Sequence, residues 1–221
     1  HVRLYTHVSE TLEEVKRIKK EYGKTPIAFL HELGFSGPDV ILVHVVYPTD
    51  EEKQILRETD TKIVDCPSNH MQLAKGVTPA PEMLSAGITV TLGTDTIGNM
   101  FTEMRNEILH QYLHHLDPKV IQPNQVFEMT TINGARAIGL SDQLGSIEPG
   151  KKADITILDL NKPHLTPLVN ILHSIVYRGE AADVNTVLVD GKVIMENREM
   201  KTVDEDNVMA TANTASMNYI K

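Results

Sequence analysis

The hydrophobic positions of this chain alternate between short apolar runs and longer amphipathic stretches. Runs typical of buried strands lie at residues 2–6, 40–46, 62–65 and 88–92. Apolar residues recur at helical spacing between them, at residues 12–22, 26–33 and 78–86, and Thr49 with the three acids after it predicts the start of a further helix. Strands that alternate with helices in this way predict an α/β fold whose strands pair in parallel.

The pattern changes after residue 145. Two longer helices that would flank the sheet are predicted before that point, at residues 100–115 and 123–139. Beyond it, strands are predicted at residues 155–158, 171–177, 184–189 and 192–195, with Asp190 and Gly191 as a hairpin turn. We therefore expect an α/β part over residues 1–145, a small β module over residues 146–202 and a peripheral, helical tail over residues 203–221.

Polar side chains with metal-binding or acid–base chemistry follow three of the apolar runs. His7 and Glu10 come after the first run, His44 after the second, and Asp95 after the run that ends near residue 92. Because the carboxyl ends of parallel strands meet at one rim, we expect these side chains to lie close together.

Each of the four side chains has a distinct chemical use. His7 and Asp95 offer a nitrogen and an oxygen that suit Zn²⁺, with Fe or Mn as alternatives, and Asp95 could also deprotonate a bound water. His44 joins them as a ligand or hydrogen-bonds to water or substrate, whereas Glu10 suits a proton shuttle. Catalytic zinc takes three or more protein ligands, so this set predicts a metal hydrolase site that is incomplete.

A structural role competes with each of these assignments. A single histidine at a strand end is more often a hydrogen-bonded structural residue than a ligand, and only the joint arrangement favours a site. The histidines at 110, 114 and 115 are explained most simply as a solvated helix face, because no HExxH pattern accompanies them. Cys66 is expected to be a buried packing residue.

Composition and charge exclude several classes of partner. The net charge of −9 and the pI near 5.5 argue against a nucleic-acid-binding surface, which needs clustered Lys and Arg. The single cysteine allows no intrachain disulfide, and the apolar runs are far shorter than the roughly 20 residues of a membrane helix. We expect a cytoplasmic protein that binds neither nucleic acid nor membrane. The chain begins with His1 rather than Met, inside an expected strand, so we also expect that an earlier segment exists.

Taken together, the motifs resemble the amidohydrolase superfamily, in its cytosine-deaminase-like branch. That branch contains S-adenosylhomocysteine and methylthioadenosine deaminases, guanine deaminases and triazine hydrolases. The resemblance spans nearly the whole chain and rests on residues 6–11 (THVSET), 43–44 (VH), 49–52 (TDEE), 66–69 (CPSN), 73–76 (LAKG), 93–95 (GTD), 100–105 (MFTEMR), 131–137 (TINGARA) and 145–154 (GSIEPGKKAD).

The resemblance implies a TIM-like (β/α)8 barrel, of which this chain holds strands five to eight, together with the C-terminal part of a small β-sandwich. By the same resemblance, His7 is a metal ligand, Glu10 the acid/base, His44 the histidine near the hydrolytic water and Asp95 a ligand and base. Ser68 and Asn69 would shape the substrate rim. The implied reaction is attack of a metal-activated hydroxide on an amidine-like ring carbon of a purine nucleoside or related N-heterocycle, with loss of ammonia.

The chain departs from this family in one respect. The first-strand His-x-His pair and the first four barrel strands have no counterpart here, so we expect a fragment that needs the missing N-terminal half, or a homo-oligomer that pairs half barrels. Two alternative functions remain open. One is a triazine-type hydrolase that releases chloride or an alkylamine, and the other is an inactive half barrel with a structural or assembly role.

Overall fold

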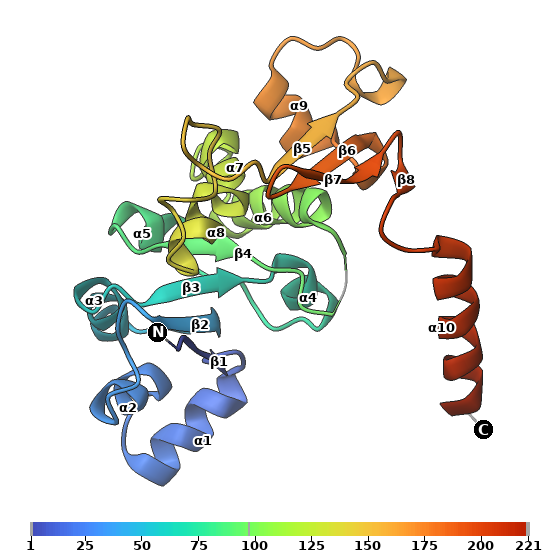
Figure 1. The fold of residues 1–221 in the computed structure, drawn as a ribbon. Helices are drawn as coiled ribbons and strands as arrows, with labels where there is room; N and C mark the ends of the chain where they lie inside the picture. The colour runs from blue at the N-terminus through green and yellow to red at the C-terminus, as the bar shows by residue number, and fades with distance from the viewer. Residues whose placement is uncertain (1, 97, 220–221) are drawn as a thin grey trace.

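The computed structural model describes residues 2–96 and 98–219 and contains two four-stranded sheets, one in the lower part of Figure 1 and one in the upper part. The first sheet has the order β1-β2-β3-β4, and every neighbouring pair is parallel. Its strands are β1 (Leu4–Val8), β2 (Val40–His44), β3 (Lys62–Asp65) and β4 (Val90–Leu92). The parallel α/β prediction is confirmed, and the carboxyl ends of all four strands share one rim.

Helices connect and cover this sheet. They are α1 (Leu12–Tyr22), α2 (Pro26–Glu32), α3 (Asp50–Glu58), α4 (Pro67–Gln72), α5 (Ala80–Ser85) and α6 (Met100–His115). Thr49 caps α3 as predicted: its hydroxyl accepts a hydrogen bond from Glu52 N, and the Glu52 carboxylate accepts one from Thr49 N. The sequence therefore sets this helix start through local hydrogen bonds.

The hydrophobic core lies between the parallel sheet and the helices behind it. Leu42, Ile63 and Val90 come from three successive strands and are fully buried. Ile108 of α6 and Met129 of α7 (Pro123–Thr130) join the same core. Burial of both strands and helices fixes the sheet, and with it the rim that carries the polar side chains.

The second sheet is antiparallel, with the order β5-β6-β7-β8. Its strands are β5 (Ile155–Leu158), β6 (Val184–Val189), β7 (Lys192–Glu196) and β8 (Glu199–Met200). The predicted hairpin between β6 and β7 is confirmed, and both Asp190 and Gly191 have positive φ, at 49° and 75°. Two consecutive positive φ values are what a tight two-residue hairpin requires.

The predicted strand at residues 171–177 is wrong, because this segment is helix α9 (Ile171–Arg178). Asn170 starts the helix by accepting a hydrogen bond from His173 N. Ile175 and Val176 are buried, and α9 packs against α6 and α7. A short apolar run does not distinguish a buried strand from a buried helix, and here tertiary packing decides.

The single helix predicted at residues 123–139 is instead two helices, α7 and α8 (Ile132–Ala137). They are separated by Thr131, which has non-helical backbone angles of φ −124° and ψ −96°. The hydroxyls of Thr130 and Thr131 both donate to Phe127 O, at 2.8 and 2.9 Å. These side-chain bonds compete with the helical backbone pattern at the break.

Several predicted boundaries also shift. Strand β1 runs to Val8 and includes His7, because the parallel ladder with β2 continues through the pairs His7–Val43 and Val8–His44. Strand β2 ends at His44, two residues earlier than expected. The sequence did not predict the short helix α4.

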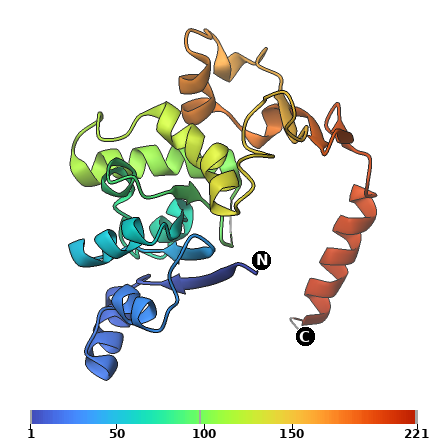
Figure 2. The ribbon, with the colours of Figure 1, turned by 60° about the vertical axis from the view of Figure 1, so that its left-hand side comes forward.

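The tail contains helix α10 (Glu205–Tyr219), which stands away from both sheets in Figures 1 and 2. None of its described residues is buried. Within the part of the chain that the structure describes, no helix is long and apolar enough to span a membrane.

Candidate functional site

The ends of β1 and β2 bring together three of the predicted functional side chains. One possible ligand atom from each of His7, Glu10 and His44 lies within 4.8 Å of the other two. His44 Nε2 is 3.3 Å from Glu10 Oε1, and the rings of His7 and His44 meet edge to face with centroids 4.7 Å apart. His7 is exposed, Glu10 is partly exposed and His44 is fully buried, so the group lies between the protein interior and solvent.

An unusual backbone conformation shapes this rim. Residues just beyond or at the strand ends have positive φ: Ser9 at 51°, His44 at 75°, Val45 at 50° and Asp95 at 51°. A left-handed conformation is rare for residues other than glycine and is especially costly for the β-branched Val45. Such strain persists only where surrounding contacts impose it, and it is concentrated at functional sites.

Glu10 is held by a lysine that the sequence analysis did not single out. Lys75 Nζ donates to Glu10 Oε1 and also to Asn69 Oδ1, the latter at 2.6 Å. Burial acts to raise the pKa of Glu10, but the hydrogen bond and charge of Lys75, with charge from His44, outweigh it and lower this pKa. Glu10 is therefore an ionised carboxylate at neutral pH, ready to accept a proton.

His44 is held as a neutral ring. Burial is the main cause that lowers its pKa to about 4, and the nearby His70 adds to the effect while Glu10 opposes it. Its Nδ1 lies 2.9 Å from His70 Nε2. Among the described residues, His44 Nε2 has no hydrogen-bond partner although it is fully buried. A buried nitrogen lone pair beside a carboxylate is a suitable ligand or hydrogen-bond acceptor for a group bound between them.

A buried polar network lies behind His44. His70 Nδ1 lies 3.1 Å from Asp65 Oδ1 at the end of β3, and Glu107 of α6, which accepts a hydrogen bond from Gln111, is buried beside Asp65. Burial acts to raise the pKa of Asp65, but the bond and charge of His70 outweigh it and lower this pKa. Burial and the neighbouring Asp65 raise the pKa of Glu107 well above its usual range. Asp65 is the last residue of the run at residues 62–65, and this place at a strand end was the available signal for it.

The remaining predicted site residues lie outside the group of three. Asp95 is exposed, three residues past the end of β4. Ser68 and Asn69 are buried in α4, where Ser68 Oγ accepts from Asn106 and Asn69 Oδ1 accepts from Lys75. Cys66 is buried, and burial raises the pKa of its thiol, which fits the expected packing role.

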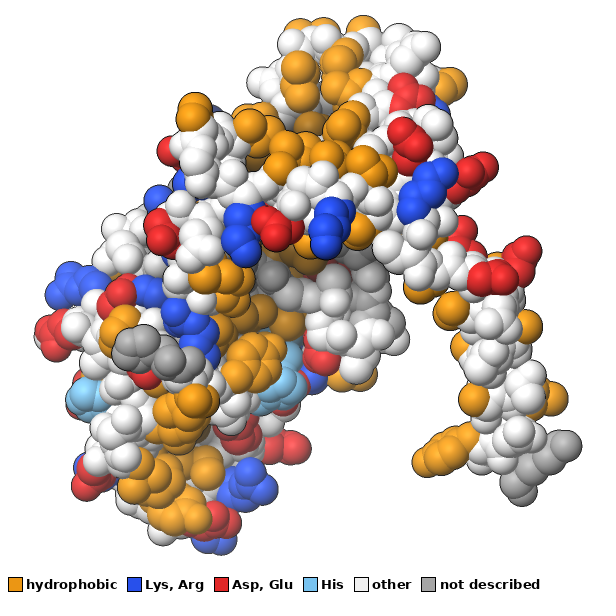
Figure 3. All heavy atoms as spheres, viewed as in Figure 1, with side chains coloured by type: hydrophobic (Ala, Val, Ile, Leu, Met, Phe, Trp, Pro, Cys, Tyr) orange, Lys and Arg blue, Asp and Glu red, His pale blue; other side chains and the backbone are white. Residues whose placement is uncertain are grey.

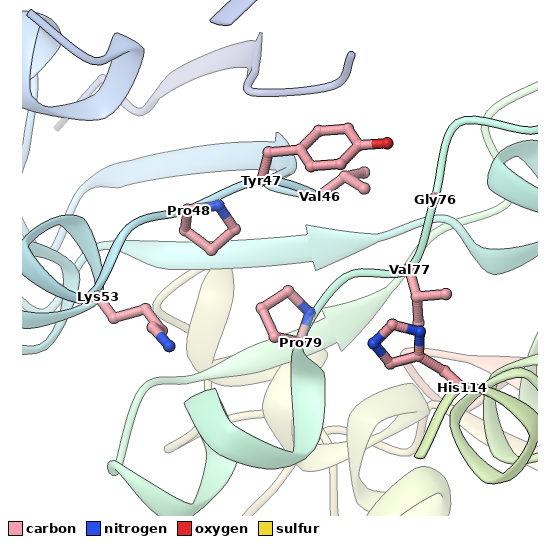
Figure 4. Close-up of a pocket in the computed structure, with 8 residues that line it drawn as sticks. All are labelled: Val46, Tyr47, Pro48, Lys53, Gly76, Val77, Pro79 and His114. Carbon is pink, nitrogen blue, oxygen red and sulfur yellow. The ribbon is translucent and has the colours of Figure 1, made fainter. Parts of the chain in front are cut away.

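A cavity of about 560 Å³ opens near the segment that follows β2 (Figure 4). Figure 4 shows Lys53 and His114 at opposite sides of the view. Its lining residues are Val46, Tyr47, Pro48, Lys53, Gly76, Val77, Pro79 and His114. None of them belongs to the group of three, but the Tyr47 hydroxyl donates to Lys75 O and links the cavity wall to the residue that holds Glu10.

Helices cover the parallel sheet, and polar side chains converge at its carboxyl rim. This arrangement is typical of α/β-barrel proteins, and the chain forms one half of such a barrel. Residues 1–194 match the amidohydrolase family. The chain therefore belongs to the amidohydrolase family, as its motifs suggest.

Curated relatives and solved structures agree with this assignment. The chain is 42% identical over 215 residues to a 5-methylthioadenosine/S-adenosylhomocysteine deaminase of Syntrophomonas wolfei, which covers 95% of this chain and 50% of the relative. It is 38% identical over 218 residues to a 5'-deoxyadenosine deaminase of Methanosarcina acetivorans, with 96% of this chain and 50% of the relative covered.

Among solved structures, a zinc-bound adenosine deaminase from Xanthomonas campestris matches with a TM-score of 0.93 and 29% identity, over 96% of this chain and 49% of that one. A zinc-complexed atrazine chlorohydrolase from Arthrobacter aurescens matches with a TM-score of 0.90 and 27% identity, over 96% and 48%. The chain thus spans about half the length of the relatives it matches.

Proposed function

We propose that this chain provides one half of a metal-dependent aminohydrolase that removes ammonia from a purine nucleoside or related N-heterocycle. The observation that carries the proposal is the convergence of His7, Glu10 and His44, in which the buried His44 Nε2 has no hydrogen-bond partner among the described residues. The deaminases among the curated relatives support the same reaction class.

The residues present fit a divalent cation, because histidine nitrogens and a carboxylate converge at ligand-compatible spacing. His7 of this group is a proposed metal ligand, together with Asp95, which lies outside the group but follows β4 of the same sheet; the rest of the metal shell would come from outside the strands described here. Zinc is the expected metal, since zinc is bound in both solved structures described above. When bound, such a metal supplies Lewis acidity and lowers the pKa of a water.

Several residues of this chain have separate roles in the proposed proton transfer. Glu10, kept ionised by Lys75, accepts the proton of the attacking water and passes it to the leaving nitrogen. His44 accepts a hydrogen bond from that water through Nε2 and orients it. Asp95 adds a second acceptor at the same rim. Ser68 and Asn69 shape the substrate side by holding Asn106 and Lys75 in place.

The test is ammonia release by the Zn²⁺-loaded protein that carries this chain, with methylthioadenosine, S-adenosylhomocysteine and 5'-deoxyadenosine as substrates. Glu10→Gln should lower kcat by at least about 10²-fold because the proton acceptor is lost. Glu13→Gln is the matched control, since it changes an exposed carboxylate of α1 and should retain the activity. Absence of ammonia release from all three substrates would contradict the proposal.

A second candidate is a triazine-type hydrolase, which the likeness to the zinc-complexed atrazine chlorohydrolase favours. Chloride release from chlorotriazines, measured beside ammonia release from adenosine derivatives, separates the two reactions. If the half barrel were only structural, Asp95→Asn would leave zinc content and turnover unchanged. We expect both to collapse in this variant.

A further inference from the structure

A buried carboxylate of α6 lies beside two segments of the rim. Glu103 is inaccessible to solvent, and its Oε2 accepts a hydrogen bond from Ser68 N at 3.0 Å. Ser68 belongs to the first turn of α4. N–H groups in the first turn of a helix lack an intrahelical partner, so this carboxylate supplies the missing acceptor. Glu103 therefore fixes the backbone of Ser68 on α6.

The side chain of Ser68 is held by the same helix. Asn106, one turn further along α6, donates from Nδ2 to Ser68 Oγ at 2.8 Å. Asn69, the next residue of α4, accepts from Lys75, which also donates to Glu10. A shift of this first turn would therefore move a side chain of the proposed substrate rim and loosen the lysine that holds Glu10.

The backbone that follows Asp95 passes over the same carboxylate. Gly98 has a positive φ of 92°, and a Cβ added there would lie 2.7 Å from Glu103 Oε1 and 3.9 Å from Ser68 Oγ. Both the left-handed backbone and the close approach require glycine at this position. Glu103 thus contacts the segment that carries Ser68 through one oxygen and the loop that carries Asp95 through the other.

We propose that Glu103 is a positioning residue that seats Ser68 of the substrate rim against the loop that carries Asp95. The catalytic consequence rests on the proposed function, in which Ser68 shapes the substrate side and Asp95 is a metal ligand. A misplacement of about 1 Å in such a site can cost about 100-fold in rate. Loss of Glu103 should therefore disturb the rim although this side chain acts only through its neighbours.

Hydrogen exchange at the Ser68 amide tests the proposal without metal or substrate. In the ¹⁵N-labelled, metal-free protein that carries this chain, we expect this amide to be protected, and Glu103→Ala should raise its exchange rate by about 10-fold or more. The amide of the buried Leu42 in β2 should stay protected, which shows that the variant is folded. Glu128→Ala removes an exposed carboxylate of α7 and is the matched control, with unchanged exchange at Ser68. A rapidly exchanging Ser68 amide in the wild type overturns the proposal, whether or not any variant folds.

Gly98→Ala tests the contact with the loop. Its Cβ would displace the Glu103 carboxylate, so exchange at the Ser68 amide should also become faster. Gly150→Ala is the matched control, because Gly150 has a similar φ of 94° but no atom within 4 Å of an added Cβ. Faster exchange at Ser68 in Gly98→Ala alone supports the proposal. Unchanged exchange in Gly98→Ala, or equal increases in both glycine variants, contradicts it.

Activity provides an independent measurement. In the Zn²⁺-loaded protein, Glu103→Ala should lower kcat/KM by about 10- to 100-fold. Ser68→Ala removes the hydroxyl that Glu103 helps to place, so Glu103→Ala should cost several-fold less in the Ser68→Ala background. Additive effects would show that Glu103 does not act through Ser68.

The two measurements also separate this proposal from the proposed function. If the wild type releases no ammonia, the proposed function fails, while the exchange rates at Ser68 still decide whether Glu103 holds the rim. If Glu103→Ala releases ammonia at the wild-type rate, the positioning role fails and the proposed function stands.

Discussion

At the scale of single residues, the candidate site depends on pairs of ionisable groups whose environments separate their pKa values. Lys75 lowers the pKa of Glu10, whereas burial beside Asp65 raises the pKa of Glu107. The pKa values of two acids near the same rim are thus shifted in opposite directions by their surroundings.

Replacement of Lys75 should change the titration of Glu10. Lys75→Met removes the hydrogen bond and the charge that lower the pKa of Glu10, while the burial that raises this pKa remains. The pKa of Glu10 should therefore rise, and its ¹³C carboxyl signal should titrate at higher pH than in the wild type. Lys53→Met, which breaks a pair with the exposed Asp50, is the control and should leave Glu10 unchanged. Equal Glu10 midpoints in the wild type and Lys75→Met would refute this explanation.

Glu107 should make stability depend on pH in a predictable direction. Its folded-state pKa is raised, so above the unfolded-state pKa the native protein keeps a proton that the unfolded chain loses, and stability falls as pH rises toward the folded-state pKa. Glu107→Gln cannot lose a proton there. The unfolding free energy of this variant relative to wild type should increase with pH, by at most about 1.4 kcal/mol per pH unit.

Urea denaturation at several pH values between 5 and 8 measures this difference. Glu21→Gln, an exposed change on α1, is the control and should follow the wild type at every pH. Parallel pH profiles for Glu107→Gln and wild type would show that Glu107 does not hold the extra proton.

Sequence reasoning found His7, Glu10 and His44 because each follows an apolar run, and parallel strands bring such positions to one rim. It did not find His70 or Lys75. Both lie in the segment after β3, and their contacts depend on how α4 and its C-terminal loop fold back over the rim. Such contacts are set by tertiary packing and leave no periodic signal in the sequence.

At the scale of elements, helix starts show when a local motif is sufficient. Helix α3 begins with a complete capping box between Thr49 and Glu52. Glu52 also accepts from Ile27 N at 2.8 Å, so it binds free N–H groups at the start of α2 as well. One buried carboxylate therefore stabilises the N-termini of two helices.

Thr49→Ala should destabilise the protein by about 1 kcal/mol, because it leaves an N-terminal N–H of α3 unpaired. Thr25→Ala is a matched control at the start of α2, where Thr25 makes no side-chain capping bond. Chemical denaturation should show a clearly larger loss for Thr49→Ala than for Thr25→Ala. Equal losses would mean that the cap at Thr49 contributes nothing beyond the general cost of removing a threonine.

The limits of local patterns are clear at residues 171–177. The segment is apolar and short enough for a strand, but Asn170 caps it as a helix and its buried face packs on α6 and α7. In contrast, the hairpin at Asp190 and Gly191 was predictable, because its positive φ values require residues that tolerate them. Turn chemistry is local, whereas the choice between buried helix and buried strand is not.

At the scale of the whole molecule, the parallel sheet is open at β1. This strand pairs with β2 on one side, and within the described part of the chain it has no strand partner on the other. Leu4, Tyr5 and Leu12 are exposed here, and Figure 3 shows hydrophobic side chains gathered at the lower left of the molecule, over this region. Because the relatives are about twice as long, we expect this edge to be covered in a complete assembly.

The chain on its own should therefore self-associate through the open edge. Sedimentation velocity should show an apparent mass that rises with protein concentration, because an exposed apolar strand edge pairs readily with another chain. Tyr5→Lys places a charge on this edge, where Tyr5 is 59% exposed, and should shift the protein toward the monomer. Leu113→Lys is the control, because it adds the same charge at an exposed apolar position of α6 and should leave association unchanged. If the wild-type chain is a monomer at all concentrations, or if both substitutions have equal effects, the β1 edge does not drive assembly.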